Sequence, residues 1–358
     1  MPGSFAAAFP RLADRVPKTA IATLPTTVSA ARLSLPGRDV EIAIKHDNLS
    51  SGLYGGNKVR KLEYLLRRAL DRGAKRVATF GAAGSNHALA TAIHARSVGL
   101  DCTCFLAHQA RTPKVPATLN MHRRVGTEIV RYGGNLEPLP LFRKYLQNRN
   151  TWVIPLGGSC WLGAVGFVEA GLELARQVAE GLIDEPERIY IACGTAGSAA
   201  GLALGLAAAR LDTVVHAIQV ADRPFTGQGK LRRLAEKTRF ILNRFDPSFD
   251  APGVQQKLVW REGFLAGGYA KVDEATIAAR DLAASQLGLS LETTYTGKAF
   301  TAMLSDLASR DGAGRPWLFW NTYNSAALPV GDAKPASLDN VPADFERYYS
   351  TTRESTTD

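Results

Sequence analysis

Two short segments of the sequence contain the residue types that covalent amine chemistry needs. The first is Tyr-Gly-Gly-Asn-Lys at 54–58, where two glycines precede Lys58 and a helical pattern follows. Because glycine has no Cβ, a bulky planar group could approach the backbone there. A lysine that forms an imine with an aldehyde needs such an approach. Most lysines at the start of a helix are only solvated, so this segment alone leaves the role of Lys58 open.

The second segment, Cys-Gly-Thr-Ala-Gly-Ser at 193–198, lies between a strand-like run and a helical pattern. Consecutive backbone N–H groups at a helix N-terminus, with hydroxyls beside them, bind phosphate or other anions. The segment lacks the Gly-Lys-Ser/Thr of a Walker loop, and its glycines at 194, 197 and 201 do not fit G-x-G-x-x-G. The candidate phosphate-binding residues are Gly194, Thr195, Ala196, Gly197 and Ser198. A tight turn is the alternative, but combined with Lys58 the segment favours pyridoxal 5′-phosphate (PLP), a phosphorylated aldehyde.

The elements that must position these segments alternate between apolar runs and helical periodicity from residue 40 onward. This pattern is typical of an α/β fold with a mostly parallel sheet. Strands are expected at 40–47, 75–82, 100–107, 127–132, 187–194, 214–220 and 316–322. Helices are expected at 57–73, 85–99, 114–125, 139–149, 202–210, 227–239, 273–287 and 295–310. A further helix is expected to follow the segment 153–167 and to end at about residue 181. Glycine-rich turns follow several strands, and open α/β folds bind ligands at those carboxyl ends.

Composition and charge exclude several other classes. The 358 residues are 46% hydrophobic and 21% charged, which is ordinary for a globular protein with two lobes. The net charge of +10 is spread along helices without a nucleic-acid-binding motif, so it favours anionic small molecules rather than nucleic acid. No apolar run reaches membrane-spanning length, and no signal peptide is recognised.

The four cysteines are too scattered for a disulfide framework, which favours buried thiols in a reducing cytoplasm. Cys102 and Cys104 alternate in a strand-like run, so both should face one side. His108 is the one nearby candidate for a further metal ligand, and no metal site is expected.

Five collinear segments resemble the family of D-cysteine desulfhydrases and 1-aminocyclopropane-1-carboxylate (ACC) deaminases. They are 42–66, 84–92 (GSNHALATA), 157–167 (GGSCWLGAVGF), 193–202 (CGTAGSAAGL) and 295–300 (YTGKAF), and the resemblance covers most of 40–325. The family has PLP as cofactor and the two-lobed tryptophan-synthase-β-like fold, fold type II. The polar C-terminal residues indicate a frayed tail at 331–358. The resemblance implies a large PLP-binding domain (1–60 plus 166–330) and a small domain (61–165). It also implies a homodimer.

The resemblance implies roles at the matching positions. Lys58 would hold PLP covalently and move the α-proton, Asn86 would bond the 3′ oxygen of the cofactor, and Thr322 would lie near its ring nitrogen. Residues 194–198 would bind the phosphate. The substrate would meet Ser85, Asn86, His87, Ser159, Trp161, Tyr269 and Tyr295, of which Ser85 and the two tyrosines are also catalytic candidates.

The reaction that the resemblance implies is an α,β-elimination of the D-cysteine desulfhydrase kind, giving pyruvate, ammonia and sulfide. A hydroxyl at the ring nitrogen makes a weaker electron sink than a carboxylate. ACC deaminases carry an acidic residue after the motif tyrosine, where this chain has Thr296, so ring opening of a cyclopropane is less well supported. An ACC deaminase-like enzyme, or one acting on another β-substituted amino acid such as L-cysteate, stays as the alternative.

Several positions depart from the family segments and leave the exact substrate open. These positions are Gly84, Cys160, Asn321, Tyr323 and Asn324. Ala196 stands where the family often has glycine, and a positive φ there would cost stability.

Two further classes of protein are consistent with parts of the sequence. A nucleotide-binding dehydrogenase or regulator could use 194–201 as a Rossmann-like turn, with Asp222 after the next strand. A protein with the PLP fold could also bind its ligand without catalysis.

Overall fold

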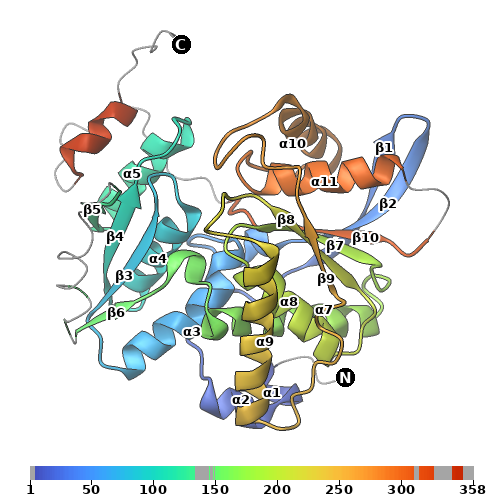
Figure 1. Cartoon of the computed structure of the whole chain (residues 1–358), viewed down its shortest axis with the longest axis horizontal. Helices are drawn as coiled ribbons and strands as arrows, with labels where there is room; N and C mark the ends of the chain where they lie inside the picture. Colours follow the sequence, from blue (N-terminus) through green and yellow to red (C-terminus); the bar gives the residue numbers. More distant parts are fainter. Residues whose placement is uncertain are drawn as a thin grey trace. The chain divides into compact units, whose positions relative to one another are not determined.

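The computed structural model describes residues 5–133, 145, 148, 150–309, 314–325 and 341–349 (Figure 1). The chain divides into two compact units, Met1–Asp71 with Gly157–Ala326 (unit 1) and Arg72–Leu156 with Ala327–Asp358 (unit 2). The boundaries expected from the sequence, at 60/61 and 165/166, lie inside helices α3 (Asn57–Asp71) and α7 (Trp161–Ala179). Both helices stay whole in unit 1.

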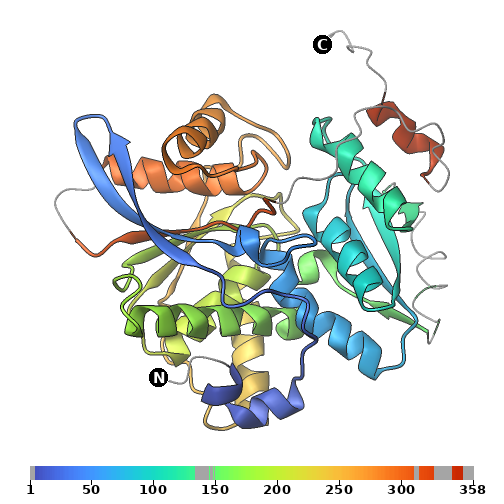
Figure 2. The ribbon, with the colours of Figure 1, turned by 180° about the vertical axis from the view of Figure 1, so that it is seen from behind.

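Among its described residues, unit 1 contains a six-stranded sheet in the order β1-β2-β10-β7-β8-β9. The strands are β1 (Val28–Leu35), β2 (Arg38–Lys45), β7 (Arg188–Cys193), β8 (Val214–Gln219), β9 (Leu258–Arg261) and β10 (Trp317–Trp320). β1 and β2 form an antiparallel hairpin, visible in blue at the edge of the sheet in Figure 2, and the other pairings are parallel. The expected α/β class with mostly parallel strands is therefore confirmed.

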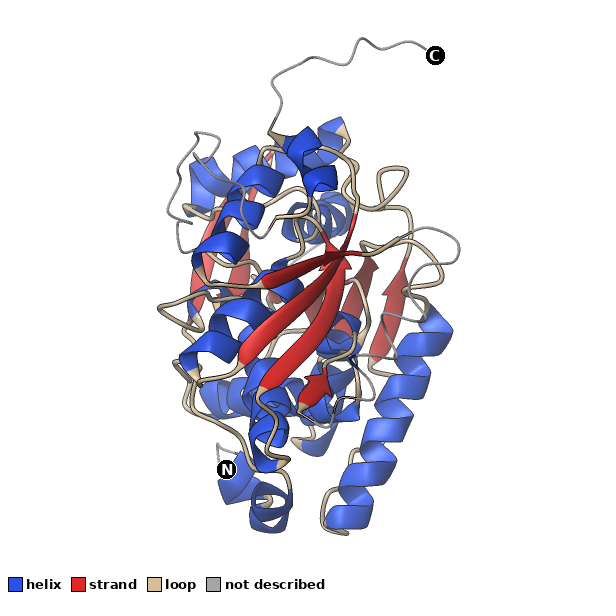
Figure 3. Ribbon diagram, turned by 90° about the vertical axis from the view of Figure 1, so that its left-hand side faces the viewer, coloured by secondary structure: helices blue, strands red, loops and turns tan. Residues whose placement is uncertain are grey.

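Helices flank this sheet, as Figure 3 shows. They are α1 (Phe5–Ala8), α2 (Pro10–Arg15), α3 (Asn57–Asp71), α7 (Trp161–Ala179), α8 (Gly197–Ala208), α9 (Gln228–Phe245), α10 (Glu274–Leu287) and α11 (Thr296–Ala308). Short 3₁₀ turns occur at Asp47–Leu49 and Leu156–Gly158. In Figure 1, α10 and α11 lie on one side of the sheet, and α7, α8 and α9 lie on the other.

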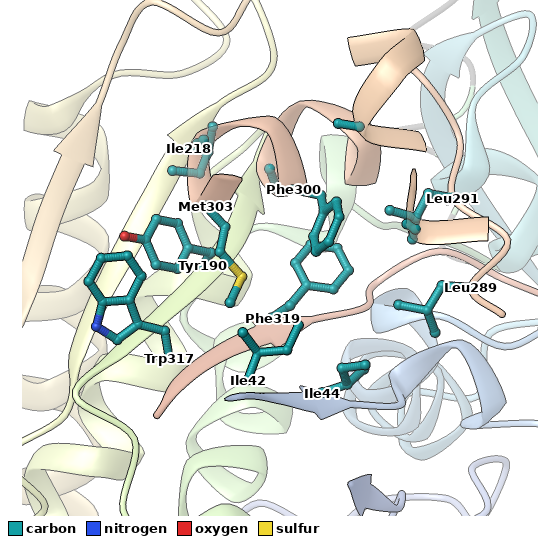
Figure 4. Close-up of a cluster of buried hydrophobic side chains, with 14 of the residues drawn as sticks. Ile42, Ile44, Tyr190, Ile218, Leu289, Leu291, Phe300, Met303, Trp317 and Phe319 are labelled. Carbon is teal, nitrogen blue, oxygen red and sulfur yellow. The ribbon is translucent and has the colours of Figure 1, made fainter. Parts of the chain in front are cut away.

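A large apolar core fills the space between the sheet and helices α10 and α11 (Figure 4). Phe300 of α11 packs edge-on against Phe319 of β10, with ring centroids 5.0 Å apart. All four residues of β10 are buried. A strand buried on both faces reads as a continuous apolar run, and for this reason Pro-Trp-Leu-Phe-Trp predicted it correctly.

Helix α8 begins at Gly197, five residues before the helix expected from the sequence. Glycine-rich sequence disfavours a helix by local propensity. Here it allows close packing, because a Cβ on Gly201 would lie 2.2 Å from the carbonyl oxygen of Ala164 in α7. Helix α7 likewise starts at Trp161, within a segment to which the sequence assigned no helix.

Unit 2 contains, within the part that the structure describes, a four-stranded parallel sheet in the order β5-β4-β3-β6. Its strands are β3 (Arg76–Ala82), β4 (Asp101–Ala107), β5 (Glu128–Arg131) and β6 (Thr151–Val153), with helices α4 (Asn86–Ser97) and α5 (Lys114–Arg124). Cys102 and Cys104 share one face of β4, as predicted, with their sulfurs 3.7 Å apart. The helix expected over 139–149 lies mostly outside the described residues.

The C-terminal segment corrects one prediction. Residues 331–358 were expected to form a polar, frayed tail, but a 3₁₀ helix, η3 (Ala343–Tyr348), packs in unit 2. Phe345 is fully buried and Tyr348 is 4% exposed, because both rings lie against His108. The prediction is wrong for 341–349; the neighbouring residues 331–340 and 350–358 lie outside the described part.

A buried network of charges joins the start of α3 to β2 and α7. The guanidinium of Arg60 bonds Asp47 (2.8 Å) and Glu173 (2.9 Å), and the Lys45 amine lies 2.5 Å from Glu173. The indole of Trp320 also donates to Asp47, at 2.8 Å. All these side chains are at most 6% exposed, so each charge depends on its partners for compensation.

None of the helices in the described ranges is long and apolar enough to span a membrane. The same residues include no group of three or more His, Cys, Asp or Glu side chains that could hold a metal ion.

Glu173 should therefore stabilise unit 1 in a pH-dependent way. Burial by itself would raise the pKa of Glu173, but the charges of Arg60 and Lys45 outweigh it and lower this pKa to about 2. Because the folded-state pKa lies below the ordinary value of 4.5, the stabilisation is present above about pH 4.5 and is lost as the pH falls toward 2. Glu173→Gln should lose about 3–5 kcal/mol of unfolding free energy at pH 7, measured by urea denaturation.

The control for this prediction is Glu180→Gln, since Glu180 is 51% exposed and makes an i,i+4 pair with Arg176. It should cost less than about 0.5 kcal/mol. The deficit of Glu173→Gln should shrink between pH 4.5 and 2 as the wild-type carboxylate becomes protonated. A deficit below about 1 kcal/mol at pH 7 would contradict this view of the network.

Candidate active site

The glycines before Lys58 let three stretches of backbone meet at the start of α3. A Cβ on Gly55 would lie 2.2 Å from the carbonyl oxygen of Asn48, and one on Gly56 would lie 2.8 Å from that of Thr322. Gly56 also has φ +91°, in the region that glycine occupies without strain. The N–H of Asn57 then donates to the carbonyl oxygen of Thr322 (3.1 Å). Bare backbone at 55–56 is thus needed for these contacts, and it places Lys58 in the first turn of α3.

A short chain of hydrogen bonds joins Lys58 to the second glycine-rich segment. The amine of Lys58 donates to Oδ1 of Asn57 (2.8 Å), and Nδ2 of Asn57 donates to the hydroxyl of Ser198 (3.0 Å). Lys58 is half-buried. The two segments that the sequence singled out, 136 residues apart between Lys58 and Gly194, therefore lie side by side in unit 1.

Residues 194–198 connect the end of β7 to the start of α8. Ala196 adopts φ 72°, ψ −22° as the N-cap of α8. The N–H of Gly197 donates to the hydroxyl of Ser159 (3.2 Å), and this hydroxyl lies 2.7 Å from Oγ1 of Thr195. Backbone N–H groups at a helix N-terminus, with two hydroxyls among them, form an anion-binding loop.

Lys61 is a buried lysine beside this loop that the sequence analysis missed. It lies one turn after Lys58 on α3, is 2% exposed, and donates to the carbonyl oxygen of Gly157 (3.1 Å) and to Ser159 (3.4 Å). Within the described residues it forms no ion pair with a carboxylate. Burial lowers the pKa of Lys61 well below its ordinary value, and the charge of Lys58 lowers it further.

These observations test whether a phosphate fits the loop. A Cβ on Gly197 would lie 2.8 Å from Nζ of Lys61 and 2.7 Å from Oγ of Ser159, so only a bare Cα allows lysine, serine and loop to converge. The convergent groups are an amine, hydroxyls and N–H donors. Such a donor set suits a phosphate group, and an anion would compensate the charge that Lys61 acquires when protonated.

Two tyrosines meet on the other side of the loop. The hydroxyls of Tyr269 and Tyr295 are 2.5 Å apart. The ring of Tyr295 lies next to Gly194, where a Cβ would be 3.6 Å from its Cε1. Burial raises the pKa of Tyr269 to about 12 and raises that of Tyr295 well above 10. Both phenols are therefore protonated at neutral pH and can donate hydrogen bonds or protons.

Lys298 holds the loop that carries Tyr269. The side chain of Lys298 is fully buried. Its amine donates to the carbonyl oxygens of Leu265 (2.7 Å) and Gly268 (3.3 Å). Asp222 accepts the N–H of Tyr269 (2.9 Å), so the residue that the dehydrogenase alternative assigned to a nucleotide positions this loop instead. Since α11 also begins after Tyr295, one helix positions both tyrosines.

Residues 321–324 lie against the start of α3. Oδ1 of Asn324 accepts the N–H of Gly55 (2.7 Å), which explains this departure from the family pattern. Thr322 is buried, at 7% exposure, and its carbonyl oxygen accepts the N–H of Asn57. Nδ2 of Asn321 is buried and has no hydrogen-bond partner among the described residues. The hydroxyl and the amide at 321–322 are thus candidates for a polar ligand atom.

Two predicted substrate residues of unit 1 lie elsewhere than beside the tyrosines. Ser159 contacts Thr195, Gly197 and Lys61, which is the anion-binding side. The ring of Trp161 packs edge-on against Phe245 at the end of α9, with centroids 5.9 Å apart. Cys160 is the N-cap residue of α7, and its side chain makes no capping bond.

Unit 2 carries the other predicted residues at the start of α4. Oγ of Ser85 caps the helix by accepting the N–H of Ala88 (3.2 Å), and Oδ1 of Asn86 accepts from the amine of Lys114. His87 is buried, with Nε2 2.9 Å from the hydroxyl of Thr79 on β3. The imidazole of His87 therefore packs inside unit 2. The first N–H groups of α4 are of the kind that can bind an anion.

The left-handed conformation of Ala196 yields a stability prediction. For a residue with a Cβ this conformation costs about 1–2 kcal/mol, so Ala196→Gly should raise the unfolding free energy by about 1 kcal/mol. Ala199→Gly, in the helical part of α8, is the matched control and should lower it by about 1 kcal/mol. Urea unfolding of both variants measures the difference, and equal losses in both would show that φ at 196 is not strained.

Comparison with known proteins agrees with this geometry. A family model described as pyridoxal-phosphate dependent enzyme matches residues 20–321. A D-cysteine desulfhydrase of Yersinia pestis (strain Pestoides F) is 31% identical over 298 residues, covering 80% of this chain and 88% of that protein. One of Salmonella paratyphi A is 32% identical over 329 residues, covering 88% and 96%.

Solved structures show the same fold. The crystal structure of an ACC deaminase homologue superimposes with a TM-score of 0.72 at 29% identity, covering 88% of this chain and 94% of that one. A fungal L-serine ammonia-lyase from Rhizomucor miehei gives a TM-score of 0.58 at 17% identity, which concerns the fold alone. Together with the family match, these likenesses confirm the expected fold class and PLP as the cofactor. The chain belongs to the family of pyridoxal-phosphate dependent enzymes.

Proposed function

We propose that this enzyme is an α,β-eliminating lyase that converts D-cysteine to pyruvate, ammonia and sulfide. The observation that carries the proposal is the hydrogen-bonded chain from Lys58 through Asn57 to Ser198. It brings the amine of Lys58 close to a loop of backbone N–H groups and hydroxyls, and this nearness supports a phosphorylated aldehyde as the cofactor. The names of the relatives that are 31–32% identical support the choice of substrate.

The phosphate of PLP would be held by residues 194–198, Ser159 and Lys61. The N-terminus of α8 would supply N–H donors, and the buried Lys61 would supply a positive charge once the phosphate favours its protonated form. Thr322, with the amide of Asn321 beside it, is the proposed partner of the ring nitrogen. When bound, PLP supplies an electron sink for charge that develops at the substrate α-carbon.

Proton movements are assigned to three side chains. Nζ of Lys58 holds the cofactor and takes the proton from the α-carbon. The phenols of Tyr269 and Tyr295 share a 2.5 Å hydrogen bond, so a proton can pass from one oxygen to the other. Because burial raises both pKa values, the pair is a general acid for the departing sulfur rather than a base.

The substrate carboxylate is assigned to the start of α4, at Ser85, Asn86 and His87. The positive end of the helix dipole and the first N–H groups favour a carboxylate there. Asn86 is also the proposed partner of the 3′ oxygen of the cofactor. These assignments rest on the resemblance of the GSNHALATA segment to the family.

The position after Tyr295 separates the two members of this family. The residue after Tyr295 is Thr296, so no acidic side chain follows the tyrosine in this chain. Thr296 is buried, and its N–H and hydroxyl donate to the carboxylate of Glu292. We therefore place ACC second among the substrates, and L-cysteate is a further alternative.

We also propose a homodimer located in the cytoplasm. The dimer follows from the resemblance to the family, and the cytoplasm follows from the four scattered cysteines, which suit a reducing compartment.

The function is tested by a substrate panel followed by product analysis. D-Cysteine, L-cysteine, ACC and L-cysteate are incubated with the holoenzyme, and pyruvate, 2-oxobutyrate, sulfide and sulfite are measured. D-Cysteine should give equal amounts of pyruvate and sulfide. Lys58→Ala should lower kcat by about 10²–10⁴-fold because the proton-transferring amine is lost. Turnover of another member of the panel without sulfide from D-cysteine would overturn the choice of substrate.

The control for Lys58→Ala is Lys237→Ala, an exposed lysine on α9, which should keep wild-type kcat.

Lys298→Met tests whether this buried lysine positions Tyr269. Without the bonds to Leu265 and Gly268 the loop loses its anchor, and a displacement of about 1 Å can cost about 10²-fold in rate. We expect kcat to fall by about tenfold to a hundredfold, with a smaller change in KM. Lys271→Met, on the same loop but exposed, should keep wild-type kinetics. Unchanged kcat in Lys298→Met would contradict the assignment.

A further inference from the structure

The segment 341–349 lies beyond the last residue that the family model matches, yet it is bonded into unit 2. It appears in dark red near α5 in Figures 1 and 2. Its apolar anchor is Phe345, fully buried against His108 with ring centroids 5.1 Å apart. Asp344 pairs with Arg131 at 3.0 Å, and the hydroxyl of Tyr349 donates to Asn120 of α5 at 2.9 Å.

A single phenol of this segment binds both backbone groups of Gln109. The N–H of Gln109 donates to the hydroxyl of Tyr348 (2.9 Å), and this hydroxyl donates to the carbonyl oxygen of Gln109 (3.0 Å). Gln109 follows β4, in a loop at the carboxyl edge of the parallel sheet. Backbone groups in such a loop lack ladder partners, so Tyr348 fixes a residue that regular secondary structure leaves without them.

The side chain of Gln109 reaches the turn before α4. Its Oε1 accepts the N–H of Gly84 (2.9 Å). A Cβ on Gly84 would lie 3.1 Å from Nε2 and 3.2 Å from Oε1 of Gln109, so glycine at 84 gives the carboxamide its room. Gly84 is one of the positions that depart from the family segment. The contact with Gln109 accounts for glycine at position 84, because a longer side chain there would occupy the space of the Gln109 carboxamide.

Gly84 is directly followed by Ser85, the N-cap of α4, and by Asn86. The N–H of Gly84 is therefore the last backbone donor before the N-cap. The proposed function assigns this cap to the substrate carboxylate. The bond of this N–H to Oε1 of Gln109 restrains the backbone directly before the N-cap. Two hydrogen-bonded steps, from Tyr348 to Gln109 and from Gln109 to Gly84, connect the C-terminal segment to the residue before the cap.

We propose that Gln109 is a positioning residue for the substrate-binding turn at 84–86, and that Tyr348 of the C-terminal segment holds Gln109 in place. The C-terminal segment thereby acts on the start of α4 through Gln109. Tyr348 and Gln109 are 239 residues apart in the sequence. Only the kinetic part of this inference rests on the proposed function. The contacts themselves predict a change in local protection that needs no turnover.

Hydrogen exchange of the full-length holoenzyme without substrate tests the contacts. In Gln109→Ala, the peptide spanning 82–90 should exchange about fivefold to tenfold faster, since Gly84 loses its acceptor. In Tyr348→Phe, the peptides spanning 82–90 and 107–111 should both exchange faster. Gln109→Glu keeps an acceptor oxygen and should keep the exchange of 82–90 within about twofold of wild type.

Tyr349→Phe is the matched control, because it removes a phenol of the same segment that bonds Asn120 instead of Gln109. It should leave the exchange of 82–90 unchanged. Wild-type exchange at 82–90 in both Gln109→Ala and Tyr348→Phe would overturn the proposal. Equal acceleration in Tyr349→Phe would also overturn it, since the effect would then come from general loosening of the segment.

Steady-state kinetics test the consequence for the substrate. Gln109→Ala should raise KM for D-cysteine about fivefold to tenfold with kcat within about twofold of wild type, because it disturbs carboxylate binding and not the reacting groups. A fall in kcat with unchanged KM would contradict the positioning role. If the wild-type enzyme does not turn over D-cysteine, the proposed function fails, and the exchange measurements still decide whether Tyr348 and Gln109 hold the turn.

Discussion

The buried pairing of Arg60 with Asp47 and Glu173 is the constraint on which the active site depends. Charges taken out of water are tolerated only where partners and geometry compensate them, so this network admits one placement of α3 against β2 and α7. Arg60 lies two residues after Lys58 and one before Lys61, and the two lysines therefore inherit that placement. The contacts of Gly55, Gly56 and Asn57 fix the same turn from its other end.

Lys58 and Lys61, on consecutive turns of α3, lie near the N-terminus of α8, where Lys61 is buried and Lys58 is half-buried. Burial lowers the pKa of Lys61, and the neighbouring Lys58 lowers it further, so a protonated Lys61 needs a negative charge nearby to compensate it. A bound phosphate would supply that charge and favour the protonated form of Lys61. The same loop supports the tyrosine pair through the contact of Tyr295 with Gly194, and α11 holds Tyr269 through Lys298. The groups proposed for binding and proton transfer thus lie at or beside the starts of α3, α8 and α11.

Much of this arrangement was predictable from the sequence, because its signals are local. Strand and helix periods gave the parallel core, and glycine spacing indicated both the approach to Lys58 and the anion loop. The β1–β2 hairpin was only half predicted, since β1 is partly exposed along its length and lacks a buried apolar run. Neither Lys61 nor Lys298 was recognised as buried from the sequence, because a buried lysine and a solvated one look alike until the tertiary contacts are known. The link between Gln109 and Tyr348 joins residues too distant in sequence for any local pattern to show it.

The most direct test of the account is to identify the lysine that holds the cofactor. The holoenzyme is reduced with borohydride, digested, and its peptides are analysed by mass spectrometry. The account predicts the mass of the reduced cofactor on the peptide that contains Lys58, with fragment ions assigning it to that residue and not to Lys61. Modification of Lys61 or Lys298 in place of Lys58, or no stable cofactor mass on any peptide, would contradict it.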